Sequence, residues 1–213
     1  MKRARHAAVV RRAAALLLDY PDRGMLERLP AVRAAVDELP GGSARDGLAA
    51  FCDHAAGTDE LELGAHYVQT FDMRRRRALH LTFYTDGDTR RRGHALARLK
   101  EVYAAHGWRP GPHELPDHLC VLLEFASRGD AGQGEALLRR FQPGLELLRS
   151  ALHRFGTPYA GVLDAVAATL PPPAAAQRDA ARRLAAQGPP AEDVGLEPYG
   201  GRAPGKEALP WPT

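Results

Sequence analysis

Charged side chains gather around apolar ones between residues 67 and 125 of this sequence. Two arginine clusters, Arg74–Arg77 and Arg90–Arg92, enclose a segment that is aromatic and apolar and that ends in the acidic turn Asp86-Gly87-Asp88. A second acidic element, Glu114-Leu115-Pro116-Asp117-His118, precedes an almost wholly apolar stretch. An amphipathic basic peptide is recognised by apolar anchors and acids together. The pattern therefore indicates a surface that binds another polypeptide.

We predict a peptide-binding surface in which apolar side chains act as anchors and acids attract positive charge. Each aromatic residue in it also fits a core position, and that alternative stays open. Carboxylates near His118 favour its protonated form, which would couple peptide binding to pH. The predicted site residues are Tyr67, Phe71, Asp72, Tyr84, Asp86, Asp88, Glu114, Asp117, His118 and Leu119.

The arginine clusters allow two interpretations. Four consecutive arginines on a helix point to all sides, so some must face the body of the protein and pair with nearby acids. The alternative is a helical adaptor that binds nucleic acid, but aromatic residues are not interleaved on the basic side. The formal net charge of +3 does not demand such a partner. Glu124, in an apolar setting, needs either an internal arginine or a basic residue of a bound peptide.

Motifs for catalysis, metal binding and membrane insertion are lacking. The sequence has no HExxH, no P-loop and no GxSxG, and its two cysteines, Cys52 and Cys120, show no metal-ligand spacing. We therefore expect no enzyme activity, no metal and no cofactor. No apolar run reaches the roughly 18 residues of a membrane span. Arg11 and Arg12 interrupt the apolar stretch near the N-terminus, so we expect an amphipathic helix there and a cytoplasmic protein.

These residues must be positioned by helices, because the apolar residues recur with a helical period nearly throughout. We predict a helix for 78–84, since a lone strand would lack a partner, a helix beginning at Asp117, and a break near Pro143 in the helical stretch 135–155. The predicted fold is all-α: a single compact bundle over residues 1–171. Residues 172–213, rich in Pro, Gly and Ala, form a mostly disordered, flexible tail in which only 177–187 is helical.

Several longer phrases resemble one known family. They are LLDYPD (17–22), YVQTFDMRRR (67–76), LTFYTDGDTRRRG (81–93), ELPDHLCVLLEFA (114–126), TPYAGVLDAVAATLP (157–171) and VGLEPYG (194–200). Together they resemble the NarJ family, also called the delta chain of respiratory nitrate reductase, which belongs to the TorD-like redox-enzyme maturation proteins. The element YTDGDTR departs slightly from the Tyr-Gly-Asp-Thr-Arg of close relatives.

The resemblance implies an all-α, cytoplasmic chaperone that is not part of the finished enzyme. Such proteins bind the N-terminal tail of the catalytic (alpha) molybdenum subunit, which is similar to a twin-arginine signal. They keep that subunit competent for molybdenum-cofactor insertion and delay its attachment to the membrane. The family's acidic element near the peptide groove matches Glu114, Pro116, Asp117 and His118. The resemblance implies no catalytic residues and no nucleic-acid partner.

Overall fold

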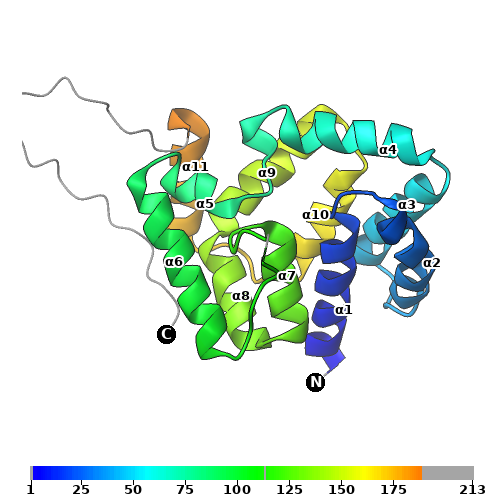
Figure 1. The fold of residues 1–213 in the computed structure, drawn as a ribbon, viewed down its shortest axis with the longest axis horizontal. Coiled ribbons are helices and arrows are strands. Elements are labelled where there is room, and N and C mark those ends of the chain that lie inside the picture. Colours follow the sequence, from blue (N-terminus) through cyan, green and yellow to red (C-terminus); the bar gives the residue numbers. More distant parts are fainter. Residues whose placement is uncertain (1, 113, 189–213) are drawn as a thin grey trace, which may run out of the picture.

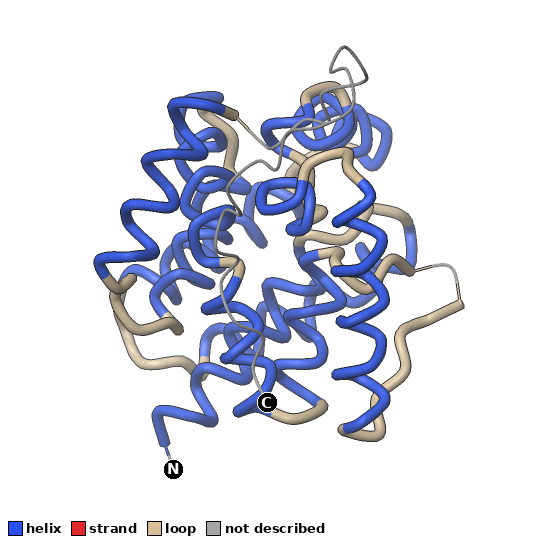
Figure 2. The backbone as a smooth tube through the Cα atoms, turned by 90° about the vertical axis from the view of Figure 1, so that its left-hand side faces the viewer, coloured by secondary structure: helices blue, strands red, loops and turns tan. Residues whose placement is uncertain are grey.

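The structure is a computed structural model that describes residues 2–112 and 114–188. Within this part of the chain it consists of helices and loops, and β-type pairing is limited to one isolated bridge between His80 and His118 (Figures 1 and 2). The all-α prediction is confirmed. The α-helices are α1 (Lys2–Leu17), α2 (Arg23–Asp37), α3 (Ser43–Ala56), α4 (Glu60–Tyr67), α5 (Leu81–Asp86), α6 (Arg90–Ala105), α7 (Leu119–Arg128), α8 (Ala131–Arg140), α9 (Gln142–Phe155), α10 (Tyr159–Ala168) and α11 (Ala175–Gln187).

Short polar side chains begin several of these helices. The carboxylates of Asp22, Asp59 and Asp130 accept hydrogen bonds from backbone N–H groups in the first turns of α2, α4 and α8. Each bond satisfies a donor that has no partner within the helix. Pro143 lies in the first turn of α9, where its missing N–H costs nothing, and the helical stretch is broken at Phe141 as predicted.

Two unusual helical turns follow α4 and carry the first arginine cluster. The chain passes directly from α4 into a π-helix, η1 (Val68–Asp72), and then into a 3-10 turn, η2 (Arg75–Arg77). The π-helix is rare in proteins and frequently occurs at functional sites. Next comes α5, which begins three residues later than the predicted 78–84 helix.

Helices far apart in the sequence pack side by side. The first helix, α1, packs against α7 and α2, while α3 packs against α10 and α2 (Figure 1). At the centre, the ring of the fully buried Tyr159 lies 4.5 Å from the ring of Phe51 and 4.8 Å from that of Phe71. A single core therefore joins the two halves of the chain.

Two predicted boundaries need comment. The helix expected from Asp117 begins instead at Leu119, because the turn 116–118 is tied to the chain before α5: Leu81 N donates to Asp117 O, and Leu119 N donates to Leu79 O. In the predicted tail 172–213, α11 packs against α9, and Gln177 donates to the carbonyl of Arg139. The rest of that predicted tail, 189–213, lies outside the described residues.

Candidate functional site

A groove with acidic and apolar walls lies between α1 and the segment that leads into α7. Its volume is about 540 Å³. One wall carries Leu16 and Asp19 from the end of α1, and the other carries Glu114 and Leu115 from the loop before α7. The helix α1 packs against α7, so the first wall lies beside the helix that follows the second wall in the chain. The remaining lining residues are Arg12, Ala15, Arg28, His80, His118, Cys120 and Glu124.

The acids at the opening of the groove form no close ion pair within the described residues, although Arg28 also lines the groove. Glu114 is exposed, and its carboxylate accepts a hydrogen bond from the backbone N–H of Gly111 (2.7 Å). In the described part of the chain, neither Glu114 nor Asp19 forms an ion pair within 4.0 Å. Partial burial and the nearby acids Asp22 and Glu114 raise the pKa of Asp19, while a hydrogen bond from the backbone N–H of Tyr20 and the charge of Arg28 oppose this rise without outweighing it. The opening therefore favours a positive charge.

An apolar anchor point lies beside these acids. The side chain of Leu115 is 45% exposed. Leu16 and Ala15 line the same groove from α1. A large exposed apolar side chain next to unpaired acids is the combination that an amphipathic basic segment can cover.

Deeper in the groove, Glu124 is neutralised by the protein itself. Arg12 and Arg128 both donate to its Oε1 atom, Arg128 at 2.8 Å. Of the two interpretations of Glu124 left open by the sequence, the internal-arginine one is confirmed. The positive charge of Arg12 also limits how far into the groove a cation of a ligand would be attracted.

Two histidines, His80 and His118, also line the groove. Their rings meet edge to face with centroids 5.1 Å apart. Burial lowers the pKa of His118 to about 4, and the nearby His80 contributes in the same direction, although Asp117 opposes it. The expectation that carboxylates keep His118 protonated near neutral pH is wrong, because desolvation of the imidazolium outweighs their attraction. Glu114 is also not on a common helix with His118, since α7 begins at Leu119.

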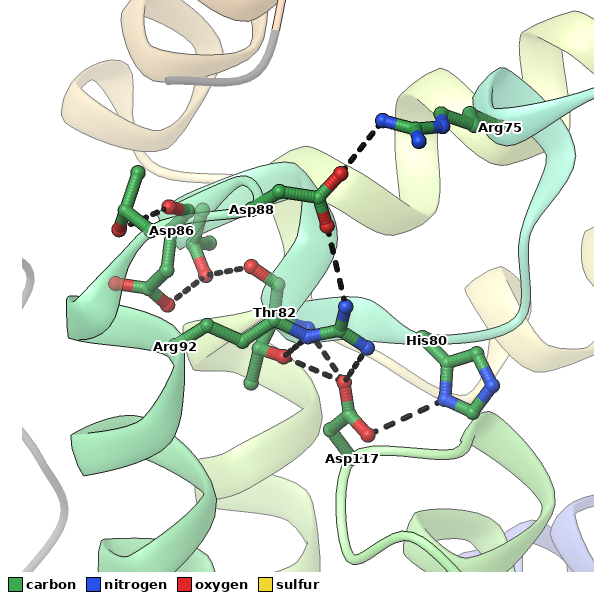
Figure 3. Close-up of polar contacts among 9 residues, drawn as sticks. Arg75, His80, Thr82, Asp86, Asp88, Arg92 and Asp117 are labelled. Carbon is green, nitrogen blue, oxygen red and sulfur yellow. Dashed lines mark hydrogen bonds and ion pairs between the residues drawn. The ribbon is translucent and has the colours of Figure 1, made fainter. Parts of the chain in front are cut away.

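Asp117 contacts His80, one member of this pair, and is fully buried. Figure 3 shows the side chains that contact it. Its Oδ1 accepts from His80 Nδ1 at 3.2 Å, and its Oδ2 accepts from Thr82 Oγ1 at 2.5 Å. Arg92 Nη2 lies 3.7 Å from the same Oδ2. Burial alone would raise the pKa of Asp117, but these hydrogen bonds and the charges of His80 and Arg92 outweigh it, and the pKa lies below the ordinary value. Asp117 therefore supports the groove from inside and has no exposed surface of its own.

The ion pairs continue outward from Asp117 to the first arginine cluster. Arg92 Nη1 lies 3.4 Å from Asp88 Oδ1, and Arg75 Nη1 lies 2.5 Å from Asp88 Oδ2 (Figure 3). For Arg75 and Arg92, the interpretation of the arginine clusters as internal ion pairs is confirmed. Asp86, on the same turn, accepts from the hydroxyl of Thr85 (2.6 Å).

The ten residues predicted from the sequence fall into four groups. Glu114 and His118 line the groove. Three acids lie outside the groove: Asp72 on η1, Asp86 at the end of α5 and Asp88 on the turn between α5 and α6. Asp117 is internal. The remaining four have side chains buried in the core, as the open alternative allowed: Tyr67, Phe71, Tyr84 and Leu119.

Sequence reasoning missed the wall of the groove that α1 contributes. Its signal is present in the phrase Leu17-Leu18-Asp19-Tyr20-Pro21: an acid and a tyrosine that is half exposed follow the last apolar residues of the helix. The sequence also contains a signal for the role of Leu115, because this leucine lies between Glu114 and Pro116 in a loop.

Within the described ranges, His, Cys, Asp and Glu side chains form no group of three that could hold a metal ion. A search of the same residues for a helix long and apolar enough to cross a bilayer found none.

Comparison with known proteins gives a consistent result. The family model described as nitrate reductase delta subunit matches residues 37–165. The chain is 31% identical over 158 residues to the probable nitrate reductase molybdenum cofactor assembly chaperone NarJ of Bacillus subtilis (strain 168), covering 74% of this chain and 86% of that protein.

Two further relatives share less of their length with it. The nitrate reductase molybdenum cofactor assembly chaperone NarJ of Escherichia coli (strain K12) is 32% identical over 152 residues, covering 70% of this chain and 64% of the relative. The nitrate reductase-like protein NarX of Mycobacterium tuberculosis (strain ATCC 25618 / H37Rv) is 35% identical over 161 residues, covering 76% of this chain and 24% of the relative. The NarJ relatives are named as assembly chaperones, in agreement with a protein that is not an enzyme.

Proposed function

Because the chain belongs to the nitrate reductase delta subunit family, we propose that it is a cytoplasmic chaperone for the assembly of nitrate reductase. It binds the N-terminal tail of the catalytic, molybdenum-containing alpha subunit. While bound, it keeps that subunit competent for molybdenum-cofactor insertion and for later assembly at the membrane. The chaperone itself holds no cofactor in this proposal.

The observation that carries this proposal is the groove between α1 and the segment before α7. It places two acids that form no ion pair within the described residues, Asp19 and Glu114, next to the exposed Leu115. A tail similar to a twin-arginine signal carries basic and apolar side chains close together. Its arginines would face the two acids, and an apolar side chain would cover Leu115 and Leu16.

The groove is also suited to binding a peptide segment reversibly. The acids at the opening are exposed or half exposed, so each contact with a cation is worth little on its own. Binding would depend on several such contacts plus the burial of a few apolar side chains, which gives a complex that can dissociate when assembly is complete.

Calorimetric titration with a synthetic peptide of the alpha subunit's N-terminal residues tests this proposal. Asp19→Asn and Glu114→Gln should each weaken binding about 3- to 10-fold, as expected for the loss of one partly screened charge contact. Glu60→Gln is the matched control, because it removes an exposed acid from the first turn of α4, outside the groove. Unchanged affinity in both groove variants would show that the tail binds elsewhere.

The nucleic-acid alternative predicts a different salt response. A peptide that is partly held by apolar contacts loses affinity gradually as salt is added, whereas nucleic acid loses it steeply because counterions are released. Tight binding of an oligonucleotide at low salt, with such a steep decline and no binding of the peptide, would replace the chaperone proposal.

A further inference from the structure

A second hollow, with the opposite charge, lies where the turn η2 meets the end of α9. Its volume is about 430 Å³. Arg74–Arg77 line it from one side, and Ala151, Arg154 and Phe155 line it from α9. It shares no lining residue with the acidic groove. We call it the arginine pocket.

The arginines of this pocket do different things. Arg77 is structural: its guanidinium donates to the carbonyls of Thr70 (2.6 Å) and Gln69 (2.9 Å) and lies 4.0 Å from the ring centre of Phe155. These carbonyls belong to the π-helix η1, whose last turn leaves acceptors without intrahelical partners. Arg77 thus holds η1 and Phe155 in place, and these position the pocket.

Three other arginines are not used in this way. Arg74, Arg76 and Arg154 are exposed, and in the described residues no carboxylate lies within ion-pair distance of their side chains. Burial lowers the pKa of Arg77, and the positive charge of Arg74 lowers it further, so the cluster repels itself. An anion in the pocket would relieve that repulsion.

Asp88 shows which anion suits these guanidinium groups. Its carboxylate approaches the pocket from the α5–α6 turn and pairs with Arg75 (Figure 3). A guanidinium presents donors in a planar fork that matches a carboxylate. Only one of the pocket's arginines receives such a carboxylate from the described part of the chain.

The surroundings limit the length of the anion. The exposed Asp72 ends η1, two residues before Arg74, and the exposed Asp88 pairs with Arg75 from the α5–α6 turn. On α9, Arg149 is neutralised by Glu146 and Asp164. An extended polyanion such as nucleic acid needs a continuous basic track for its phosphates and would meet these acids. A short acidic segment would not.

Apolar side chains at the edge favour a peptide over a simple anion. Phe155 is 43% exposed and Met73 is 68% exposed. Together with the free guanidinium groups they offer both charge and apolar contact.

From these contacts we propose that the arginine pocket is a second docking site, which binds a short acidic segment of a partner polypeptide that carries at least one apolar side chain. The carboxylates of the segment pair with Arg74, Arg76 and Arg154, and its apolar side chain covers Phe155. The site is independent of the acidic groove, so it does not rest on the function proposed above.

Fluorescence anisotropy with the full chain and a labelled nine-residue peptide of alternating Asp and Leu tests this. The double variant Arg76→Gln/Arg154→Gln should weaken binding at least 10-fold. The control variant Arg3→Gln/Arg5→Gln removes the same charge from the exposed start of α1 and should leave binding within 2-fold. A peptide with Asn in place of Asp should bind at least 10-fold more weakly than the Asp peptide.

Each other outcome overturns the proposal. Equal affinity of the pocket variant and the control would show that the acidic peptide binds by net charge alone. Equal binding of the Asn peptide would remove the carboxylates from recognition. A single-stranded oligonucleotide that binds the pocket more tightly than the peptide would assign it to nucleic acid. Circular dichroism checks that the variants, which change exposed side chains, keep the fold.

Discussion

At the scale of single residues, Asp117 shows how a buried charge can be tolerated. A carboxylate removed from water is costly unless it is paired and hydrogen-bonded. Here His80, Thr82 and Arg92 supply those contacts, and all three lie at least 25 positions away in the sequence. The side chain therefore joins the segment before α7 to α5 and α6 (Figure 3).

Asp117→Asn should lower the free energy of unfolding by about 3 kcal/mol, since it leaves Arg92 and its hydrogen-bonding partners without a buried anion. The pKa of Asp117 lies below the ordinary 3.8. Its ionised form thus stabilises the fold above that pH, and the stabilisation is lost as the pH falls through the lower folded-state value.

Urea titrations at pH 7 and pH 3 measure both effects, and the loss caused by Asp117→Asn should be smaller at pH 3. The exposed Asp88, replaced by Asn, is the comparison, and its loss should stay below about 1 kcal/mol. Equal losses for the two variants at pH 7 would contradict the internal role of Asp117.

His118 makes a different contribution to pH dependence. Its pKa is about 4 in the folded protein, compared with an ordinary value of 6.5, mainly because burial disfavours the charged ring. As the pH falls, His118 of the unfolded chain is protonated before His118 of the folded protein. The stability that the neutral, buried His118 contributes is therefore fully present above pH 6.5 and declines as the pH falls toward 4. In His118→Gln, the fall in unfolding free energy between these pH values should be smaller by about 2–3 kcal/mol. Parallel stability curves for the two proteins would exclude this.

At this scale the sequence predicted types of contact better than positions. It indicated that arginines pair with internal acids, as Arg75 and Arg92 do, whereas the binding surface near residue 114 stays a prediction. The sequence could not predict that Asp117 is buried, because its burial depends on the packing of α5 and α6 against the turn 116–118. It also missed Asp19, whose groove partner Glu114 lies 95 positions away.

At the scale of elements, α3 and α10 approach each other at a pair of glycines. A Cβ atom added to Gly47 would lie 2.6 Å from the carbonyl oxygen of Gly161, closer than real contacts allow. Because the obstacle is backbone, it cannot rotate away. The backbones of the two helices thus lie in close contact at these glycines.

Gly47→Ala should therefore destabilise the protein by about 1–3 kcal/mol, as overpacking does. Gly93→Ala in α6 is the matched control, since that glycine is exposed and an added Cβ would touch nothing within 4 Å. The control should stabilise by about 0.5–1 kcal/mol because alanine favours the helix. Thermal melts of both variants measure these changes, and a gain from Gly47→Ala would mean that the helices can separate at little cost.

Elements were predicted where local chemistry decides them. The break near Pro143 acts within one turn, so the sequence reveals it. The π-helix at Val68–Asp72 has no such local signal, because Arg77 and the packing of the core hold it.

At the scale of the whole molecule, each half of the chain covers apolar surface of the other. The partner of α1 is α7, and the partner of α3 is α10. A fragment of residues 1–105 lacks both partners and should show no cooperative thermal transition, whereas residues 1–188 should unfold in one step. Circular dichroism during heating distinguishes the two. A sharp transition in the fragment would show that α1–α6 form a unit of their own.

The long separation in sequence between α1 and α7 also determines when these two helices can pack in a newly synthesised chain. Asp19 leaves the ribosome long before Glu124, and at roughly 5–20 residues per second the interval is about 5–20 s. Throughout that time, the face of α1 that α7 will cover has no partner in its own chain. The acidic groove therefore cannot form until α7 has been synthesised, and a chain whose translation stops before α7 never acquires it.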